Sequence, residues 1–305
     1  MNIKPLVAIH CFVYNHEPYL RDCFEGFVMQ QTNFPFVAIV HDDASTDGST
    51  AIIREYEEKY PHIFKPIYET ENQYSKHDGS IDRIMNKSID AFCPKYVAMC
   101  EGDDYWIDPQ KLQKQVDYFE NNIDCGLVCG KAMVFHQQKN VFVDNKGELE
   151  DSRFENLYQG YDDLITPTVM MKYSLYKQCI QELSPLMSLN LFFDTAIWYW
   201  FSLKSNIYVL DSILAVYRVL PNSACHSTTD SKIIELNYKY LNLKIAFMSI
   251  LNDFHDDRLG FMMCEIMKMQ NEISKYAQEM AKQSVRQSVR YRIGNKILHL
   301  LRGKQ

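Results

Sequence analysis

The sequence predicts an α/β fold: a mostly parallel sheet with helices on both faces, followed by a C-terminal helical extension. Two observations lead to this prediction. Apolar runs of strand composition alternate with helical patterns through the first hundred residues, and consecutive parallel strands need helical crossovers that cover the sheet. From about Lys232 onward the pattern is helical to the end of the sequence.

The elements follow from local patterns. Four strands are predicted at 5–14, 36–43, 64–69 and 95–101. The helical patterns between them carry Leu20, Phe24 and Phe27, then Ile52, Ile53 and Tyr56, then Ile84 and Ile89. Asp108 and Pro109 predict the N-cap and first position of a helix that carries Leu112, Val116 and Phe119. A strand at 125–135 and motif segments at 165–171, 192–202 and 212–219 complete the predicted domain.

Bulk properties describe an ordinary globular protein. The sequence has 305 residues, of which 47% are hydrophobic and 23% charged, so we expect one main domain with an appended piece. There is no run of about eighteen apolar residues, from which we expect a cytoplasmic protein without a membrane span. The nine cysteines include no C-x-x-C pair, which favours reduced, mostly buried thiols.

Charge is distributed unevenly. Residues 282–305 contain basic but no acidic side chains, so the formal charge of −7 divides into +7 for this tail and −14 for the rest. An acidic body argues against nucleic acid as its ligand. The tail has the composition of a helix that lies on an anionic membrane surface, at the inner face of the plasma membrane; a helix packed on the domain with a solvated basic face is the alternative.

Polar side chains gather where predicted strands end, and this is where open α/β sheets bind ligands. Tyr14 and Asn15 follow the first strand, and Asp42 and Asp43 follow the second. The stretch 43–54 matches the opening of a calcium loop but has Arg54 where that loop needs glutamate, so we interpret it as a strand-to-helix turn. Carboxylates at Asp42 and Asp43 can accept hydrogen bonds from a uracil imide or ribose hydroxyls.

The fourth strand ends in MCEGDDYW, with carboxylates at Glu101, Asp103 and Asp104. Like charges this close repel one another, and Mg²⁺ or Mn²⁺ bound by one or two carboxylates and substrate phosphates would relieve the repulsion. A solvated acidic turn that caps the next helix is the alternative interpretation, but Asp108 already supplies a cap. The cluster therefore predicts a divalent metal site.

These three motifs, in this order, resemble the GT-A glycosyltransferases of family 2, clearly over residues 5–120 and more weakly to about 230. The resemblance implies a nucleotide-diphospho-sugar transferase fold, a nucleotide-sugar donor as co-substrate, Mn²⁺ or Mg²⁺ on its diphosphate, and inversion at the anomeric carbon. It places the donor contacts at Phe12, Tyr14, Asn15, Asp42, Asp43, Arg83 and Asp103. Metal ligands fall at Asp103, Asp104 and, through a C-terminal histidine found in several such enzymes, His226.

Inversion needs a base that takes the proton from the acceptor hydroxyl. The resemblance places it in the segment FFDTAIWYWFS, whose single acid is Asp194; an N-cap is the alternative role for this residue. The acceptor contacts expected from the same comparison are Tyr105, Trp106, Thr166, Thr168 and Trp198, of which Trp198 is equally compatible with a place in the core.

The resulting hypothesis is an inverting, metal-dependent hexosyl- or N-acetylhexosaminyltransferase. It uses a UDP-sugar donor and a glycan or lipid-linked glycan acceptor, as in cell-envelope polysaccharide biosynthesis. We expect a glycosyltransferase domain at 1–230, with a nucleotide-binding half (1–120) and an acceptor-binding half (121–230), and a helical region with a basic amphipathic tail at 231–305. A sugar-phosphate nucleotidyltransferase and a non-catalytic nucleotide-sugar or glycan-binding protein are the alternatives.

Overall fold

The computed structural model describes residues 4–146, 157, 164–189, 193–220 and 230–251, together with scattered positions between 264 and 282. The chain divides into two compact units, residues 1–221 and 222–305. The division predicted after residue 230 stays a prediction, because residues 221–229 lie outside the described part of the chain. No helix among the described residues combines the length and apolar character needed to cross a bilayer.

The first hundred residues fold as predicted. Strands and helices alternate in the order β1 (Val7–Val13), α1 (Leu20–Val28), β2 (Phe36–Asp42), α2 (Ser49–Lys59), β3 (Phe64–Tyr68), the short helix η1 (Tyr74–Lys76), α3 (Ser80–Asp90) and β4 (Tyr96–Met99). Each predicted apolar run forms a strand and each predicted helical pattern forms a helix, because these segments bury a continuous or one-sided apolar surface.

The second half of the first unit is more irregular. Its elements are β5 (Tyr105–Trp106), α4 (Lys111–Asn121), β6 (Cys125–His136), β7 (Val141–Lys146), η2 (Thr166–Thr168), β8 (Met170–Lys172), α6 (Tyr173–Glu182), η3 (Ser184–Leu189), α7 (Phe193–Lys204) and β9 (Asn206–Val219). In the second unit, α8 spans Asp230–Leu251.

The predicted start of α4 was wrong. The helix begins at Lys111, with Gln110 as N-cap residue, and not at Asp108 and Pro109. The Asp108 carboxylate forms a turn ahead of the helix: Oδ1 accepts a hydrogen bond from the Gln110 amide at 2.9 Å, and Oδ2 contacts Lys114 Nζ at 2.6 Å. Asp side chains satisfy nearby backbone groups in such turns as readily as at an N-cap.

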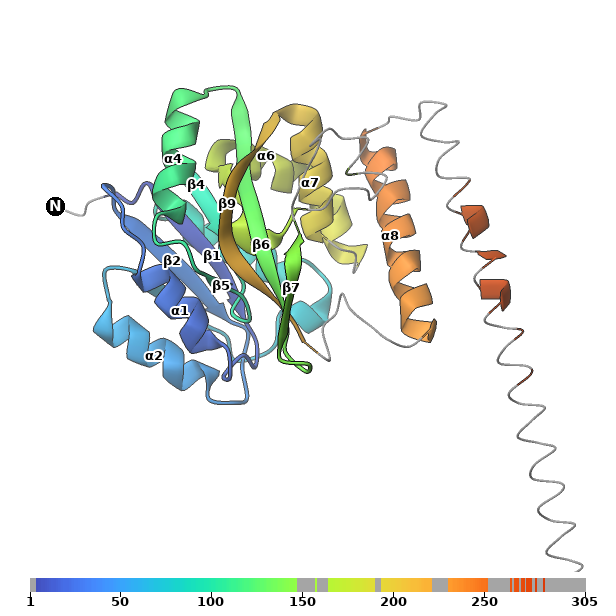
Figure 1. Cartoon of the computed structure of the whole chain (residues 1–305), viewed down its shortest axis with the longest axis horizontal. Helices are drawn as coiled ribbons and strands as arrows, with labels where there is room; N and C mark the ends of the chain where they lie inside the picture. The colour runs from blue at the N-terminus through green and yellow to red at the C-terminus, as the bar shows by residue number, and fades with distance from the viewer. Residues whose placement is uncertain are drawn as a thin grey trace, which may run out of the picture. The chain divides into compact units, whose positions relative to one another are not determined.

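The described strands form one sheet in the order β3-β2-β1-β4-β8-β6-β9-β5, with β7 paired to β6 (Figure 1). The pairs β3–β2, β2–β1 and β1–β4 are parallel. From β4 onward the sheet is mixed, because β8 runs antiparallel to both β4 and β6, while β6 and β9 are parallel. The carboxyl ends of β1, β2 and β4 therefore lie at one edge.

Helices cover both faces of the sheet. On one face the main core contains apolar side chains of α1, α2 and α4 packed on alternate residues of β1, from Val7 to Val13. The opposite face is contacted by α3, α6 and α7. Because β1 is buried on both faces, its end is held firmly where the polar loops begin.

Candidate functional site

The loops that follow β1 and β2 are locked together by hydrogen bonds. Three consecutive amides after β1 are used: Asn15 N donates to Ser45 Oγ at 3.0 Å, His16 N to Ser49 Oγ at 2.9 Å, and Glu17 N to Asp47 Oδ2 at 3.0 Å. In return, the Thr46 amide donates to Asn15 Oδ1 at 2.7 Å and the Gly48 amide to Glu17 Oε2 at 2.7 Å.

Asp42 and Asp43, at the end of β2, are both buried and fully engaged. Asp42 Oδ1 accepts a hydrogen bond from the Ser45 amide at 3.0 Å, and Oδ2 accepts one from the Thr50 hydroxyl at 2.5 Å. Asp43 accepts from the backbone amides of Gln73 at 2.6 Å and Tyr74 at 3.0 Å. Both carboxylates thus stabilise the loops around the donor side, and their contact with a nucleotide stays a prediction.

The other predicted donor residues have different environments. The Phe12 ring lies between His10, with centroids 4.5 Å apart, and His41, at 5.6 Å. Tyr14 is 45% exposed and free to stack on a ligand. Arg83, on α3, is exposed and donates to the Asp78 carbonyl at 2.7 Å. Among the described residues, no hydrogen bond or ion pair joins Arg83 to the carboxylates after β4; its ion pair is with Asp78.

The EGDDYW turn lies directly beside the end of β1. The Gly102 amide donates to the Phe12 carbonyl at 3.0 Å. A Cβ atom at Gly102 would come within 2.7 Å of His16 Nδ1 and 3.0 Å of Val13 Cγ2, so only glycine allows this approach. The turn is closed by the Asp104 amide, which donates to the Glu101 carbonyl at 3.1 Å.

Negative charge concentrates around this turn. Burial, reinforced by the charge of Asp103, raises the pKa of Asp104 well above its usual range. Glu101 is accessible to solvent, yet desolvation by the protein that surrounds it, with the charges of Asp103, Asp194 and Asp82, raises its pKa to about 8. Desolvation also raises the pKa of Asp82 to about 6. The charges of Asp103, Asp194 and Asp82 thus act on Glu101, and those of Asp103 and Glu101 act on Asp104, as expected where a cation is to bind.

The predicted metal ligands do not form a complete set of ligands within the described residues, so the metal site stays a prediction. Among the described residues, no three His, Cys, Asp or Glu side chains converge on one point that could hold a metal ion. Asp104 Oδ1 accepts a hydrogen bond from the Arg218 amide at 2.7 Å, and no hydrogen bond to Oδ2 is found in the described part of the chain. Carboxylate oxygens of this kind fit Mn²⁺ or Mg²⁺, which takes its remaining ligands from phosphate and water. His226 lies outside the described residues.

Asp194 lies in the first turn of α7 and is partly buried. Its Oδ1 accepts a hydrogen bond from the Thr195 amide at 2.7 Å, and its Oδ2 contacts the Thr166 hydroxyl at 3.5 Å. Desolvation raises its pKa above the usual value, although these hydrogen bonds act in the opposite direction. Asp194 thus makes the local contacts of a residue at the start of a helix. Its raised pKa also suits a general base.

Three of the predicted acceptor contacts are contradicted by burial. Trp106 and Trp198 are each 2% exposed and Thr168 is 0% exposed, so they offer no surface to an acceptor. Trp106 Nε1 donates to the Pro167 carbonyl at 2.8 Å, and the Thr168 hydroxyl donates to the Ile165 carbonyl at 2.8 Å. These side chains belong to the core that supports the turn.

Tyr105 and Thr166 remain partly exposed, so their contact with an acceptor stays a prediction. Asp82 was not predicted as a site residue, and His16, a polar residue directly after the first predicted strand, was assigned no role in the site. Asp82 stands in the first turn of α3, where an acid is common on dipole grounds alone. The His16 side chain is recognisable only once Gly102 is seen to pack against it.

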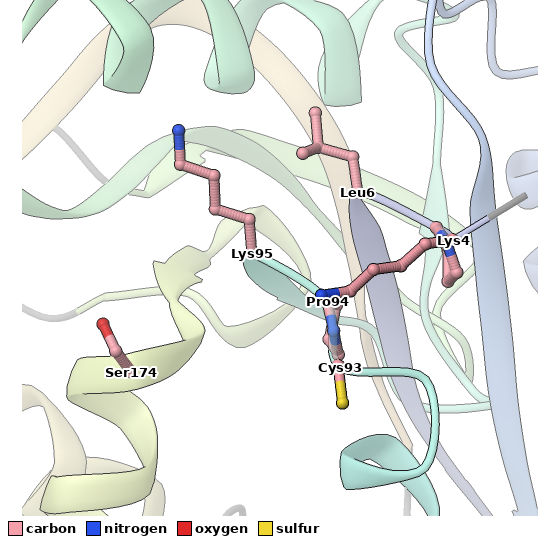
Figure 2. Close-up of a pocket in the computed structure, with 7 residues that line it drawn as sticks. Lys4, Leu6, Cys93, Pro94, Lys95 and Ser174 are labelled. Atoms are coloured by element: carbon pink, nitrogen blue, oxygen red, sulfur yellow. The ribbon is translucent and has the colours of Figure 1, made fainter.

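A separate pocket lies at the amino ends of β1 and β4, and Figure 2 shows residues that line it. It is lined by residues that precede β1 and β4, with one contribution from α6: Lys4, Pro5, Leu6, Cys93, Pro94, Lys95 and Ser174. Because β1 and β4 are parallel, their amino ends lie away from the carboxylates. This pocket is therefore distinct from the candidate site.

Comparisons with known proteins show which sequences and folds the chain resembles. A protein of Mycobacterium tuberculosis (strain H37Rv) is 38% identical over 151 residues, which is 50% of this chain and 39% of that protein. The chain thus spans less than half of the length of this curated relative. Among solved structures, S. aureus TarS 1–349 in complex with UDP-GlcNAc has a TM-score of 0.55 at 16% identity, covering 80% of this chain and 70% of that chain.

A second structure is the mannosyltransferase PcManGT from Pyrobaculum calidifontis in complex with GDP-Man and Mn²⁺. It has a TM-score of 0.52 at 14% identity, covering 92% of this chain and 81% of that chain. Both likenesses show the GT-A fold predicted from the sequence. The model of the family "Glycosyl transferase family 2" matches residues 9–180, more than half of the sequence, and the chain therefore belongs to glycosyl transferase family 2.

Proposed function

We propose that this protein is an inverting, metal-dependent glycosyltransferase that moves a sugar from a nucleoside-diphosphate donor, a UDP-sugar, to a glycan or lipid-linked glycan acceptor. One arrangement carries the proposal: Trp106, at the end of the turn after β4, donates through Nε1 to the Pro167 carbonyl at 2.8 Å, and the adjacent Thr166 hydroxyl contacts Asp194 Oδ2 on α7 at 3.5 Å. The charge of Asp194 also helps to raise the pKa of Glu101, about ninety residues away in the sequence. The proposed metal side and base side of the reaction thus belong to one site.

The residues after β4 are suited to a divalent cation. Asp103 and Asp104 would hold Mn²⁺ or Mg²⁺, with His226 as a further candidate outside the described residues. When bound, the ion supplies positive charge that stabilises the diphosphate leaving group. Asp104 is buried and has an oxygen without a partner in the described part of the chain, and both features favour a cation over a solvated acidic turn.

The proton chemistry belongs to Asp194. Its carboxylate accepts the proton of the acceptor hydroxyl while the acceptor oxygen forms a bond to the anomeric carbon. The bond from that carbon to the donor diphosphate breaks, and the diphosphate leaves with the electron pair. A raised pKa strengthens the base, and the Thr166 and Thr195 contacts hold its oxygens in a fixed orientation.

The nucleotidyltransferase alternative is disfavoured by the loop after β1. Such a loop binds a triphosphate through free backbone amides. Here the amides of Asn15, His16 and Glu17 already donate to side chains of the β2–α2 loop. A triphosphate would have to displace all three hydrogen bonds.

The membrane contact proposed for residues 282–305 concerns positions that, apart from Lys282, lie outside the described residues. Sedimentation with vesicles of anionic and of neutral lipid tests it directly. A location at the inner face of the plasma membrane requires that the protein sediments with the anionic vesicles only. Sedimentation with neither vesicle type, or equally with both, refutes it.

The central experiment screens nucleoside diphosphates and their sugars by thermal shift with Mn²⁺ and with EDTA, followed by assay of transfer or hydrolysis. We expect stabilisation by a nucleotide sugar that requires the metal, and a product of inverted anomeric configuration by NMR. Asp194→Asn should lower kcat by about 10²-fold or more with donor binding retained, whereas Asp117→Asn, at an exposed acid on α4, serves as the matched control.

The outcomes separate the alternatives. Metal-dependent binding without any turnover, in the presence of varied acceptors, supports the non-catalytic binding protein. Full activity of Asp194→Asn overturns the assignment of the base, and a product with retained configuration overturns inversion.

A further inference from the structure

Arg218, near the end of β9, is a buried cation at the centre of several elements. Only 6% of it is exposed, and its guanidinium carbon lies 4.9 Å from the centroid of the Tyr19 ring and 5.0 Å from that of Tyr105. A buried charge is strongly unfavourable unless each of its donors finds a partner. The partners of Arg218 therefore indicate what the residue holds in place.

Each guanidinium nitrogen has its own partner on a different segment. Nε donates to the Asp103 carbonyl at 2.7 Å, Nη1 to Gln137 Oε1 at 3.0 Å, and Nη2 to Asp22 Oδ2 at 2.9 Å. The planar fork thus ties the turn after β4 to helix α1 and to the loop after β6. A lysine ammonium cannot reproduce this geometry, because it presents one point of charge.

The backbone of Arg218 holds the next residue of the same turn. Its amide donates to Asp104 Oδ1 at 2.7 Å, while its side chain holds the carbonyl of Asp103. One residue of β9 therefore fixes both carboxylate-bearing positions, and it leaves Asp104 Oδ2 and the Asp103 carboxylate for other contacts.

We propose that Arg218 is a positioning residue that holds the Asp103–Asp104 turn in the geometry that binds a divalent cation with the donor diphosphate. This inference rests on the proposed function. Because each guanidinium nitrogen donates a hydrogen bond within the protein, we assign Arg218 a role that acts through the turn. Changing a partner that orients a metal ligand typically lowers metal affinity by about 10- to 100-fold.

The test measures Mn²⁺ binding in the presence of UDP by the EPR signal of free Mn²⁺. Arg218→Gln should raise the Kd for Mn²⁺ by about 10-fold or more, and Arg218→Lys, which keeps the charge but loses the fork, should also raise it. UDP affinity in EDTA should be unchanged, because the loops around Asp42 and Asp43 make no contact with Arg218. Arg21→Gln, at an exposed arginine of α1 paired with Glu55, is the matched control and should bind Mn²⁺ like the wild type.

A purely structural role predicts a lower Tm with an unchanged Kd for Mn²⁺ in the folded variants, and that result overturns the inference. If the variants do not fold, hydrogen exchange of the wild type decides. A preformed turn requires slow exchange of the Gly102 and Asp104 amides before Mn²⁺ and UDP are added, and fast exchange that slows only with ligand overturns it. Failure of the wild type to bind Mn²⁺ with UDP refutes the metal-dependent function and this inference together, whereas unaffected variants refute the inference alone.

Discussion

Lys111, on α4, allows a quantitative prediction. The side chain is 0% exposed, with Nζ 2.8 Å from Gln115 Oε1 and 4.2 Å from the centroid of the Trp106 ring. Burial lowers its pKa from 10.5 to about 7. At about 1.4 kcal/mol per pH unit, keeping the buried amine protonated costs about 5 kcal/mol relative to the unfolded chain.

The direction in which the free energy of unfolding changes with pH follows from proton binding to Lys111. Between pH 7 and 10.5 the unfolded chain holds a proton on Lys111 that the folded protein releases, so the free energy of unfolding rises with pH in this window. The contribution of Lys111 amounts to about 2 kcal/mol between pH 7 and pH 9. Lys111→Met keeps an unbranched side chain over the Trp106 ring and removes the charge, but it leaves Gln115 Oε1 without its donor, at a cost of about 1–3 kcal/mol.

We therefore expect Lys111→Met to be more stable than the wild type by about 1–3 kcal/mol at pH 7, with a smaller advantage at pH 9. Urea unfolding at both pH values measures the two free energies, and other groups that titrate in this range cancel in the comparison. A variant that is less stable at pH 7, or whose advantage does not shrink by pH 9, would refute a lowered pKa for Lys111.

Three further predictions concern the site loops and the face of the sheet beneath them. Ala44 has a φ angle of 60°, which is unfavourable for any residue with a Cβ atom, so Ala44→Gly should raise the free energy of unfolding by about 1 kcal/mol in urea. Burial lowers the pKa of His10 to about 4. As the pH falls below 6.5, the unfolded chain binds a proton at this residue that the folded protein does not bind, so the free energy of unfolding decreases. In thermal melts, His10→Leu should therefore lose about 2 kcal/mol less of this free energy between pH 7 and pH 5 than the wild type. The Thr166 contact lowers the pKa of Asp194, so Thr166→Val should move the acid limb of the kcat/KM profile to higher pH, whereas Thr166→Ser should leave it in place.

The fold was predictable where local patterns are strong. β1, β2 and β4 are short apolar runs buried on both faces, and such runs leave few alternatives to a parallel sheet with crossover helices. The mixed half of the sheet was not predictable, because β8 is only three residues long and its antiparallel pairing with β4 and β6 depends on contacts between distant segments. Asp108 shows the same limit within one short segment, because an aspartate side chain can either cap a helix or close a turn ahead of the helix.

The candidate site was likewise predictable only in part. Acids at strand ends are visible in the sequence, and a sheet topology alone brings them to one edge. Which side chains point outward is decided by tertiary packing: Trp106 follows the acidic turn in sequence, yet its ring packs against Phe27 of α1 with centroids 4.9 Å apart. An aromatic residue next to a motif therefore does not by itself predict a wall of the binding site.

The two acidic loops differ in how their charge is compensated, and this difference indicates which of them needs a ligand. After β2, the oxygens of Asp42 and Asp43 accept hydrogen bonds from three backbone amides and one hydroxyl, so each carboxylate oxygen has a partner within the protein. After β4, the Asp104 carboxylate accepts a hydrogen bond from only one group in the described part of the chain, the Arg218 amide, while the charges of Asp103 and Glu101 add to the effect of burial in raising its pKa. Under the proposed function, a divalent cation carried with the donor diphosphate would reduce the repulsion among these acids and would supply positive charge at the point where negative charge develops in the reaction.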